Sequence, residues 1–337
     1  MTGRIFTALV MTLASLCAYP SSYTKDVWHA LERGADVDVL FRVVDDEGVP
    51  VDGASCSGWL YQEGVKGQGS GYSGTTDTNG CFRVRGKCGE WFSLVVRKKG
   101  WYETMLTTNY PCDKTEPMIV DGKWQPYGET RTVVLKKIAH PIPLGKVGRC
   151  SIAIPEFDKW IGFDFEKRQW VPPYGSGESA DVMLRFGRDI QDRQTNYKVT
   201  MDVSFAHLPH AGCYELKSDA FSERNTVYHA DTNACFQTTL SYSQVRRPES
   251  RRVENWLDKD SYLVFRTRTA TDEEGRLKSA HYGIIRGPWS SFNTMLSSGF
   301  LFNAVPNDIN LEDDHTARLS QLHYQHSLEF EKSRKGK

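Results

Sequence analysis

Alternation of apolar and polar residues is the dominant pattern of this chain. Val37, Val39, Phe41 and Val43 occupy every second position of one stretch, which is the period of a strand with one buried face. The alternation returns over residues 197–205 and in several shorter runs of the second half. The sequence therefore predicts a mainly β protein built from antiparallel strands.

Turn residues fit the same interpretation. Asn79-Gly80 follows Asp77-Thr78 between two alternating runs, and Asn-Gly favours a hairpin because both residues tolerate positive φ. Residues 272–275, Asp-Glu-Glu-Gly, separate the alternating runs 262–269 and 276–285 and predict a second hairpin. Residues 316–330 have an approximate helical period and predict one short C-terminal helix.

These elements divide the chain into two β-rich domains. Residues 36–138 form the first, a β-sandwich, and residues 151–337 form the second, whose role is not assigned by any motif. Between them, Pro141 and Pro143 alternate in residues 139–150, so we expect an extended linker there. Residues 21–35 read as a leader before the first strand.

Three motifs of the first domain occur in a family-specific order. Residues 48–54 read Gly-Val-Pro-Val-Asp-Gly-Ala, residues 76–82 Thr-Asp-Thr-Asn-Gly-Cys-Phe, and residues 98–102 Lys-Lys-Gly-Trp-Tyr. This order resembles the carboxypeptidase regulatory-like family, whose domains have the transthyretin-like, Ig-like sandwich fold. The resemblance covers about residues 36–138 and implies an accessory module without catalytic residues. The chain departs from the family in four cysteines and in a Gly-rich insertion, 64–74, which we expect to be a flexible hairpin loop.

The second half has a resemblance of its own. Residues 162–165, 281–285 and 303–312 are similar to C-terminal regions of uncharacterised secreted bacterial proteins. That likeness implies no activity.

The N-terminus predicts export. Arg4 precedes an apolar run at residues 5–16, as in a secretory signal peptide that would end near residue 20. The run is shorter than the roughly 20 residues that a membrane-spanning helix needs. We therefore expect a periplasmic or extracellular protein without a transmembrane segment in its mature chain.

Cysteine usage agrees with an oxidising compartment. The chain has eight cysteines, and removal of Cys17 with the signal peptide leaves seven. We expect Cys213 and Cys235 to form a disulfide, because they are close in sequence and belong to neighbouring predicted strands. One odd cysteine would then be free or would join two chains.

The charge balance bears on the kind of partner. Lys plus Arg and Asp plus Glu both number 42, so the formal net charge is zero. A general nucleic-acid binder normally has a basic excess, and we expect no nucleic-acid partner. The basic run at residues 246–252 is either an exposed loop or a contact for an anionic glycan or phosphate.

Acidic residues offer the main candidates for chemistry. The chain has neither a Gly-x-Ser-x-Gly nucleophile motif nor a His-Glu-x-x-His zinc motif. Asp164 and Glu166 lie two positions apart and are flanked by Trp160 and Trp170. Such a pair, about 7 Å apart along a strand, could serve glycoside hydrolysis or contact a sugar. The alternative is that both acids lie on the solvent face of an amphipathic strand.

One stretch could bind a metal. Asp308, Asn310 and Glu312 alternate as oxygen ligands do at the start of a calcium loop, although the EF-hand glycine and distal glutamate are missing. The alternative is an acidic surface turn. The pairs His207/His210 and His323/His326 supply too few ligands for a metal site alone, so we expect no cofactor besides possible calcium.

The combined features predict a non-enzymatic exported bacterial protein. It would bind an extracellular or envelope carbohydrate or protein, or form part of the cell envelope. The alternative function is an extracellular glycan hydrolase with acidic residues in the C-terminal half.

Overall fold

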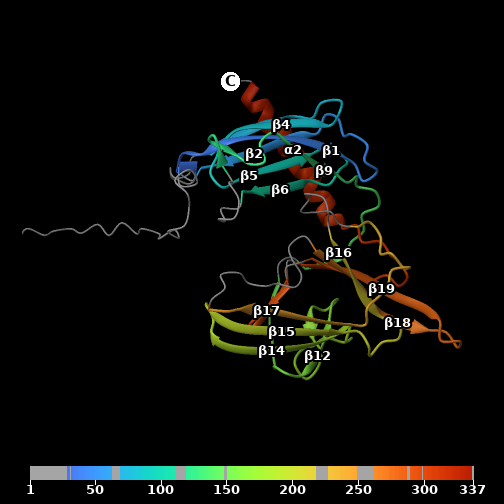
Figure 1. Ribbon diagram of the computed structural model, residues 1–337. Helices are drawn as coiled ribbons and strands as arrows, with labels where there is room; N and C mark the ends of the chain where they lie inside the picture. The colour runs from blue at the N-terminus through green and yellow to red at the C-terminus, as the bar shows by residue number, and fades with distance from the viewer. Residues whose placement is uncertain are drawn as a thin grey trace, which may run out of the picture.

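The computed structural model describes residues 29–30, 32–62, 69–110, 119–147, 150–217, 227–248, 261–286, 289–297 and 299–335 (Figure 1). The signal segment 1–20 and most of the leader lie outside these residues, as do Cys17 and Cys112. The predicted fold class is confirmed, because the described chain is mainly β with one long C-terminal helix. No helix of the described part has the length and apolar character needed to cross a membrane.

Two sheets build the N-terminal half. One has the strand order β4-β1-β8-β7, and β9 pairs in parallel with β1. The other is antiparallel, with the order β3-β2-β5-β6. The first sheet comprises β1 (Ala35–Val44), β4 (Cys81–Cys88), β7 (Ile119–Val120), β8 (Lys123–Trp124) and β9 (Glu129–Val134). The second comprises β2 (Ser55–Tyr61), β3 (Gly69–Thr75), β5 (Trp91–Arg97) and β6 (Thr104–Asn109).

The alternating residues of the first strand fill the core between these sheets. Val37, Val39, Phe41 and Val43 are all buried, and the Phe41 ring meets Phe92 of the opposite sheet edge-on at 6.2 Å. Burial of each such side chain stabilises the fold by about 1.5–3 kcal/mol. The local period thus fixes which face of β1 points inward.

The Gly-rich stretch corrects one expectation. Residues 69–74 of the expected flexible loop belong to the regular strand β3 (Gly69–Thr75), which pairs with β2 in full register. Residues 63–68 lie outside the described chain. The small residues of β3 leave room for a large side chain of the neighbouring strand.

The second half contains three sheets. Their orders are β13-β12-β14-β15-β17, β10-β22-β19-β18-β16 and β11-β21-β20. The first contains β12 (Trp160–Asp164), β13 (Gln169–Trp170), β14 (Val182–Asp192), β15 (Asn196–Ser204) and β17 (Thr239–Arg246). The second contains β10 (Gly145–Val147), β16 (Gly212–Lys217), β18 (Ser261–Thr271), β19 (Leu277–Arg286) and β22 (Phe300–Asn303). The third contains β11 (Cys150–Ala153), β20 (Trp289–Ser291) and β21 (Thr294–Ser297).

An aromatic core joins the two larger sheets of this half. Phe165, just after β12, stacks on Phe265 of β18 at 4.3 Å and meets Phe300 of β22 at 5.1 Å. The hairpin predicted at residues 272–275 is present between β18 and β19. Part of the predicted linker 139–150 belongs to a sheet of the second half, because β10 (Gly145–Val147) pairs with β22.

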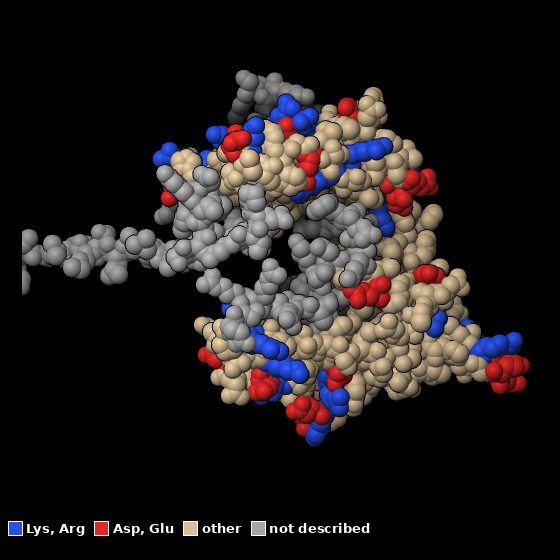
Figure 2. Space-filling view, in the orientation of Figure 1, with Lys and Arg blue, Asp and Glu red and all other residues tan. Residues whose placement is uncertain are grey.

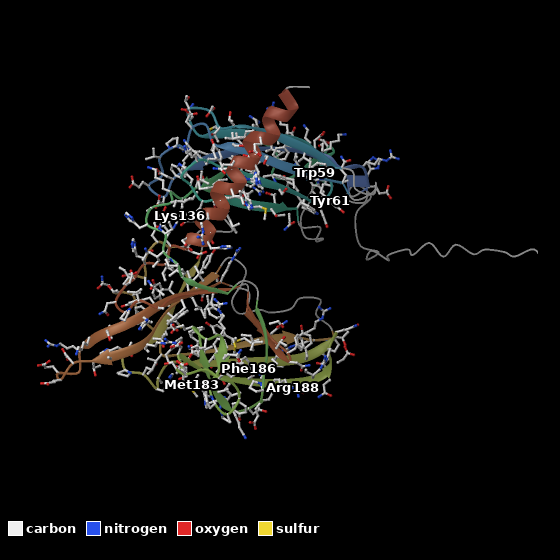
Figure 3. All side chains as sticks on the ribbon, turned by 180° about the vertical axis from the view of Figure 1, so that it is seen from behind. Trp59, Tyr61, Lys136, Met183, Phe186 and Arg188 are labelled. Atoms are coloured by element: carbon white, nitrogen blue, oxygen red, sulfur yellow. The ribbon has the colours of Figure 1, made fainter. Side chains whose placement is uncertain are left out.

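The C-terminal helix α2 (Asp314–Lys335) is longer than the predicted 316–330. It begins after Asp313, whose Oδ2 accepts the Thr316 N–H at 3.0 Å, as an N-cap residue does. Figures 1 and 3 show α2 crossing the N-terminal sandwich rather than the second half, and it contacts β5. Gln321 fixes this position, since its Oε1 accepts the Gly100 N–H at 2.9 Å and its Nε2 donates to the Trp101 carbonyl at 3.1 Å.

Charged side chains of both signs are interspersed over the described part of the visible face (Figure 2). This distribution agrees with the zero formal net charge of the chain. Local sites therefore decide which ligands the protein attracts, since the overall field favours neither sign.

Candidate functional site

The acidic pair proposed from the sequence lies at the end of β12. Asp164 is fully buried and Glu166 is exposed. Asp164 Oδ1 accepts the Lys167 N–H at 2.9 Å, and its Oδ2 accepts the N–H groups of Glu178 at 2.8 Å and Ser179 at 3.0 Å. The sequence predicted either a carboxylate that reaches a sugar or one on a solvent face, but these backbone donors satisfy Asp164 inside the protein.

Arg268 of β18 completes this cluster. Its Nη2 donates to Asp164 Oδ1 at 3.0 Å, its Nε donates to Asp181 Oδ1 at 2.7 Å, and its Nη1 bonds Glu166. Asp181 is also fully buried. One guanidinium thus ties three carboxylates together and joins the sheet of β12 to the sheet of β18.

The electrostatics of the cluster suit a structural role. Burial raises the pKa of Asp164, but backbone hydrogen bonds from Lys167, Glu178 and Ser179 outweigh it, so the pKa lies below its usual value. A glycosidase acid needs the opposite shift and an oxygen that reaches substrate. Burial raises the pKa of Asp181, which has no solvent exposure either.

The two tryptophans of that proposed site point to different surroundings. Trp160 is 43% exposed, and the Arg185 guanidinium lies over its ring at 5.0 Å. Trp170 is buried in the core, where its Nε1 donates to the Ala153 carbonyl at 2.8 Å. The structure therefore does not bring the four residues to one surface, and the exposed Trp160 ring contacts Arg185 instead.

The calcium candidate forms a set of turns. Asp308 Oδ1 accepts the Asn310 N–H at 2.9 Å, and Asn310 Oδ1 accepts the Glu312 N–H at 2.8 Å. The buried carboxylate of Glu312 accepts the Tyr102 hydroxyl at 3.0 Å and the His140 N–H at 2.5 Å. The three side chains thus bond the backbone and the first sandwich. Among the described residues, no group of three or more His, Cys, Asp or Glu could hold a metal ion.

His207 and His210 do not converge on one site. His207 Nε2 bonds the Ala180 carbonyl at 2.7 Å, and His210 Nε2 bonds the Gly275 carbonyl at 2.8 Å. Each ring thus anchors a different loop.

The proposed Cys213–Cys235 disulfide is absent, since both residues are free cysteines, Cys213 buried and Cys235 exposed. Cys213 of β16 pairs with Gln237 in an isolated bridge, and Cys235 lies two residues before Gln237, outside any strand. The strand expected at Cys235 begins only at Thr239, so the two cysteines do not face each other as strand neighbours.

A groove that the sequence did not indicate lies between the outer face of the second sheet and α2. We call it the Trp59 groove, and it has a volume of about 660 Å³. Ligand pockets of proteins commonly measure about 300–1,000 Å³. Its lining residues are Ser55, Ser57, Gly58, Trp59, Gly71, Tyr72, Ser73, Ser93, Val95, Arg97, Glu103, His323, His326 and Ser327.

The floor of the groove is the exposed indole of Trp59, which lies over glycines of β3. Trp59 points outward from β2 and is 43% exposed (Figure 3). A Cβ atom on Gly69 would lie 2.0 Å from the indole Nε1, and one on Gly71 would lie 3.1 Å from the benzo ring. The ring therefore lies across β3, and the glycines allow it to lie flat there.

Aromatic rings continue along the same face. Tyr61 follows Trp59 by two residues on β2, and Leu60 beside it pairs with Phe92, the neighbour of Trp91. The Tyr61 and Trp91 rings stack at 4.6 Å with an interplanar angle of 13°. The outer face of β2 thus presents two aromatic side chains in a row, one of them supported by a stacked partner.

Charged groups form the opposite wall of the groove. Arg97 Nε donates to Glu103 Oε2 at 2.6 Å, and Arg97 Nη1 donates to Ser57 Oγ at 3.2 Å. The same Glu103 oxygen lies 3.1 Å from His323 Nδ1 of α2. These bonds hold polar groups in fixed positions beside the indole, and they join the helix to the sheet.

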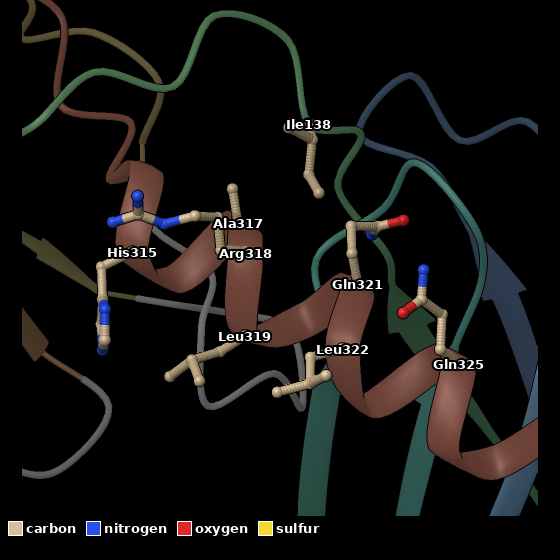
Figure 4. Close-up of a pocket in the computed structure, with 8 residues that line it drawn as sticks. All are labelled: Ile138, His315, Ala317, Arg318, Leu319, Gln321, Leu322 and Gln325. Carbon is tan, nitrogen blue, oxygen red and sulfur yellow. The ribbon is translucent and has the colours of Figure 1, made fainter.

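A second hollow lies along α2, where the helix passes Ile138 (Figure 4). Its volume is about 620 Å³. The side chains that line it are Ile138, His315, Ala317, Arg318, Leu319, Gln321, Leu322 and Gln325. It contains no aromatic platform, so the Trp59 groove is the better candidate site.

Comparisons with known proteins assign this chain to no family. No family model matches the chain, and no curated protein matches it. Solved structures that are similar include 3-chlorocatechol 1,2-dioxygenase from Rhodococcus opacus, at 15% identity over 32% of this chain and 62% of that one, with a TM-score of 0.25. Hydroxyquinol 1,2-dioxygenase from Pseudomonas putida has 14% identity, 31% and 57% coverage and a TM-score of 0.23.

Catechol 1,2-dioxygenase from Acinetobacter radioresistens gives similar values, with 16% identity, 33% and 55% coverage and a TM-score of 0.25. The chain thus spans less than two thirds of each of these structures. Similarity at these TM-scores does not indicate a shared activity.

Proposed function

We propose that this chain is a carbohydrate-binding protein rather than an enzyme, and that the Trp59 groove is its binding site. The observation that carries the proposal is the exposed, glycine-backed indole of Trp59 beside the fixed polar groups of Ser57, Arg97 and Glu103.

The chemistry of a sugar matches this arrangement. A pyranose ring has an apolar face of C–H groups and a rim of hydroxyls. The face can pack on an aromatic ring, and the hydroxyls need hydrogen-bond partners when water is displaced. Trp59 offers the ring, and Ser57, Ser73, Ser93 and Arg97 line the groove with polar groups.

The length of the aromatic row favours an oligosaccharide over a single sugar. Trp59 and Tyr61 project from the same face of β2, and residues two apart on a strand are about 7 Å apart. Tyr61 is held in place by its stack on Trp91. Two such rings in a row can contact successive sugar units.

Two features of the sequence support the same proposal. The motifs of residues 36–138 resemble the carboxypeptidase regulatory-like family, whose domains are accessory modules. The apolar run at residues 5–16 favours export, which would bring the protein to extracellular or envelope glycans. We propose the family membership and the export together with the function.

A thermal-shift screen against soluble polysaccharides tests this function. A ligand that binds only the folded state stabilises it by about 2.7 kcal/mol at a hundredfold excess over its Kd. We expect one glycan to raise the Tm of the wild type. The Trp59→Ala variant should lose about 2 kcal/mol of binding free energy or more, which is roughly 30-fold in Kd.

Trp160→Ala is the matched control, because Trp160 has the same exposure, 43%, on the second half of the chain. It should bind the glycan as the wild type does. The proposal fails if no glycan shifts the Tm, or if Trp59→Ala binds as tightly as the wild type.

A further inference from the structure

The outward side chains of β2 form a row that changes from aromatic to polar. Tyr61, Trp59 and Ser57 are each two residues apart on the strand, so successive members of the row lie about 7 Å apart on one face. Arg97 of β5 belongs to the same face, because it pairs with Ser55 in the register of β2 and β5. Its Nη1 donates to Ser57 Oγ at 3.2 Å, so the guanidinium lies at the polar end of the row.

Glu103 is a carboxylate at that polar end, and one of its oxygens is open to a ligand. It directly precedes β6, lines the Trp59 groove and is 8% exposed. Its Oε2 accepts the Arg97 Nε hydrogen bond at 2.6 Å and lies 3.1 Å from His323 Nδ1. Its Oε1 makes no hydrogen bond to any residue that the structure describes. An ionised carboxylate has about four acceptor sites, so this oxygen can still accept a donor from a bound ligand.

Arg97 supplies a matching donor. Its Nε and Nη1 bond Glu103 and Ser57, whereas its Nη2 makes no hydrogen bond within the described part of the chain. One free donor and one free acceptor thus belong to a single ion pair. Among the described residues that line the groove, Glu103 is the only carboxylate. The Arg97 and Glu103 side chains are 19% and 9% exposed, so salt screens the charge of Glu103 less than it screens a surface carboxylate.

We propose that the Arg97–Glu103 pair makes the Trp59 groove selective for neutral glycans over acidic ones, an inference that rests on the proposed function. A sugar hydroxyl both donates and accepts, so two neighbouring hydroxyls can donate to Glu103 Oε1 and accept from Arg97 Nη2. A carboxylate on the sugar has no hydrogen to donate, and its charge meets the charge of Glu103. Specific sites use such a repulsive group against the wrong ligand, and a site built to bond a hydroxyl rejects an analogue that lacks it. Glu103 therefore determines specificity, while Trp59 supplies the aromatic contact.

Calorimetric titration of the full chain with matched glycan pairs tests the proposal. The neutral probes are cellopentaose and β-1,4-linked mannopentaose. Each is compared with its counterpart in which C6 is oxidised to a carboxylate, the glucuronate and the mannuronate pentamer, in one buffer at one ionic strength. We expect the wild type to bind a neutral pentamer about tenfold or more tightly than its uronate counterpart, because the uronate loses a hydrogen bond to a charged group and meets a like charge.

Two variants assign the selectivity to Glu103. Glu103→Gln keeps an acceptor oxygen and loses the charge, so it should reduce the preference for the neutral pentamer to about threefold or less. Ser57→Ala is the matched control, because it removes a neutral group that bonds the same guanidinium. It should weaken both members of a pair alike and leave their ratio unchanged. Thermal melting of each variant checks that it is folded, and the wild-type ratio needs no variant.

The outcomes separate this inference from the proposed function. Equal or tighter binding of the uronate by the wild type overturns the selectivity, even where Trp59→Ala abolishes binding of the neutral pentamer and so supports the function. An unchanged ratio in folded Glu103→Gln overturns the role of Glu103. Binding of no pentamer, or binding that Trp59→Ala leaves unchanged, overturns the groove as the site and this inference with it.

Discussion

Replacement of Asp164 by Asn should destabilise the protein and leave the Trp59 groove intact. Each carboxylate oxygen of Asp164 accepts two hydrogen bonds, Oδ1 from Lys167 N and Arg268 Nη2, and Oδ2 from Glu178 N and Ser179 N. Asparagine keeps one carbonyl oxygen, so in either orientation its NH₂ group faces two donors. The substitution also removes the charge that faces Arg268.

The size of the effect follows from two opposing terms. Removal of one partner of a buried ion pair costs about 3–5 kcal/mol, because the other charge stays buried. Here Arg268 retains Asp181 and Glu166, and loss of the Asp164 charge relieves its repulsion of Asp181, which contributes to the raised pKa of Asp181. We therefore expect a loss near the lower limit, about 3 kcal/mol.

Urea unfolding followed by tryptophan fluorescence measures this loss as a lower midpoint at an unchanged slope. Glu274→Gln is the matched control, because Glu274 is an exposed carboxylate paired with Arg276, and such pairs contribute about 0–1 kcal/mol. A loss below about 1 kcal/mol for Asp164→Asn would refute the structural role of this carboxylate. Loss of a hydrolytic activity with unchanged stability would instead support the glycosidase alternative.

Three further predictions concern hydrogen bonds between residues that are far apart in the sequence. Glu312→Ala should lower the Tm measured by calorimetry, because it leaves the buried hydroxyl of Tyr102 and the part-buried N–H groups of Ala139 and His140 without their acceptor. The loss of the Tyr102 partner alone should cost about 1–3 kcal/mol, and an unchanged Tm would contradict this. Gln321→Ala should make α2 more sensitive to limited proteolysis than Gln325→Ala does, since only Gln321 bonds the backbone of the sandwich among the described contacts; equal cleavage would contradict it. The Arg83 hydrogen bond lowers the pKa of Asp38, so its stabilisation is present above about pH 3.9 and is lost as the pH falls through the lower native value; acid titration should therefore destabilise the wild type more than Asp38→Asn, and equal acid sensitivity would contradict this.

Strands with a clear alternation were predictable because their signal is local. Residues 197–205 alternate in the sequence, and the structure forms β15 over Asn196–Ser204 with Tyr197, Val199, Met201 and Val203 buried. The hairpin at residues 272–275 was predictable for the same reason, since turn residues and flanking strands are neighbours in the chain.

The Trp59 groove was not predictable in this way, because its walls are far apart in the sequence. Glu103 and His323 meet across it although 220 residues separate them. The helix itself was predicted, but nothing in its period tells which domain it contacts. One local signal was present, since Gly69 and Gly71 alternate along a strand next to Trp59, which is a pattern that admits a large ring.

Asp164 shows how the same pattern can mislead. An acid beside alternating apolar residues usually points to solvent, but here a guanidinium 104 residues away and three backbone N–H groups take the place of water. Burial of a charge is decided by such partners. The sequence shows the acid but not the partners that tertiary structure brings to it.

Hydroxyl-radical footprinting with the glycan from the screen tests the central claim most directly. Trp59 and Trp160 are equally exposed, 43% each, so Trp160 is an internal control for radical dose in the same molecule. The proposal predicts that saturating glycan protects Trp59 and Tyr61 from oxidation while the oxidation of Trp160 stays unchanged. Protection of Trp160 with no change at Trp59 would contradict it and would move the site to the second half of the chain.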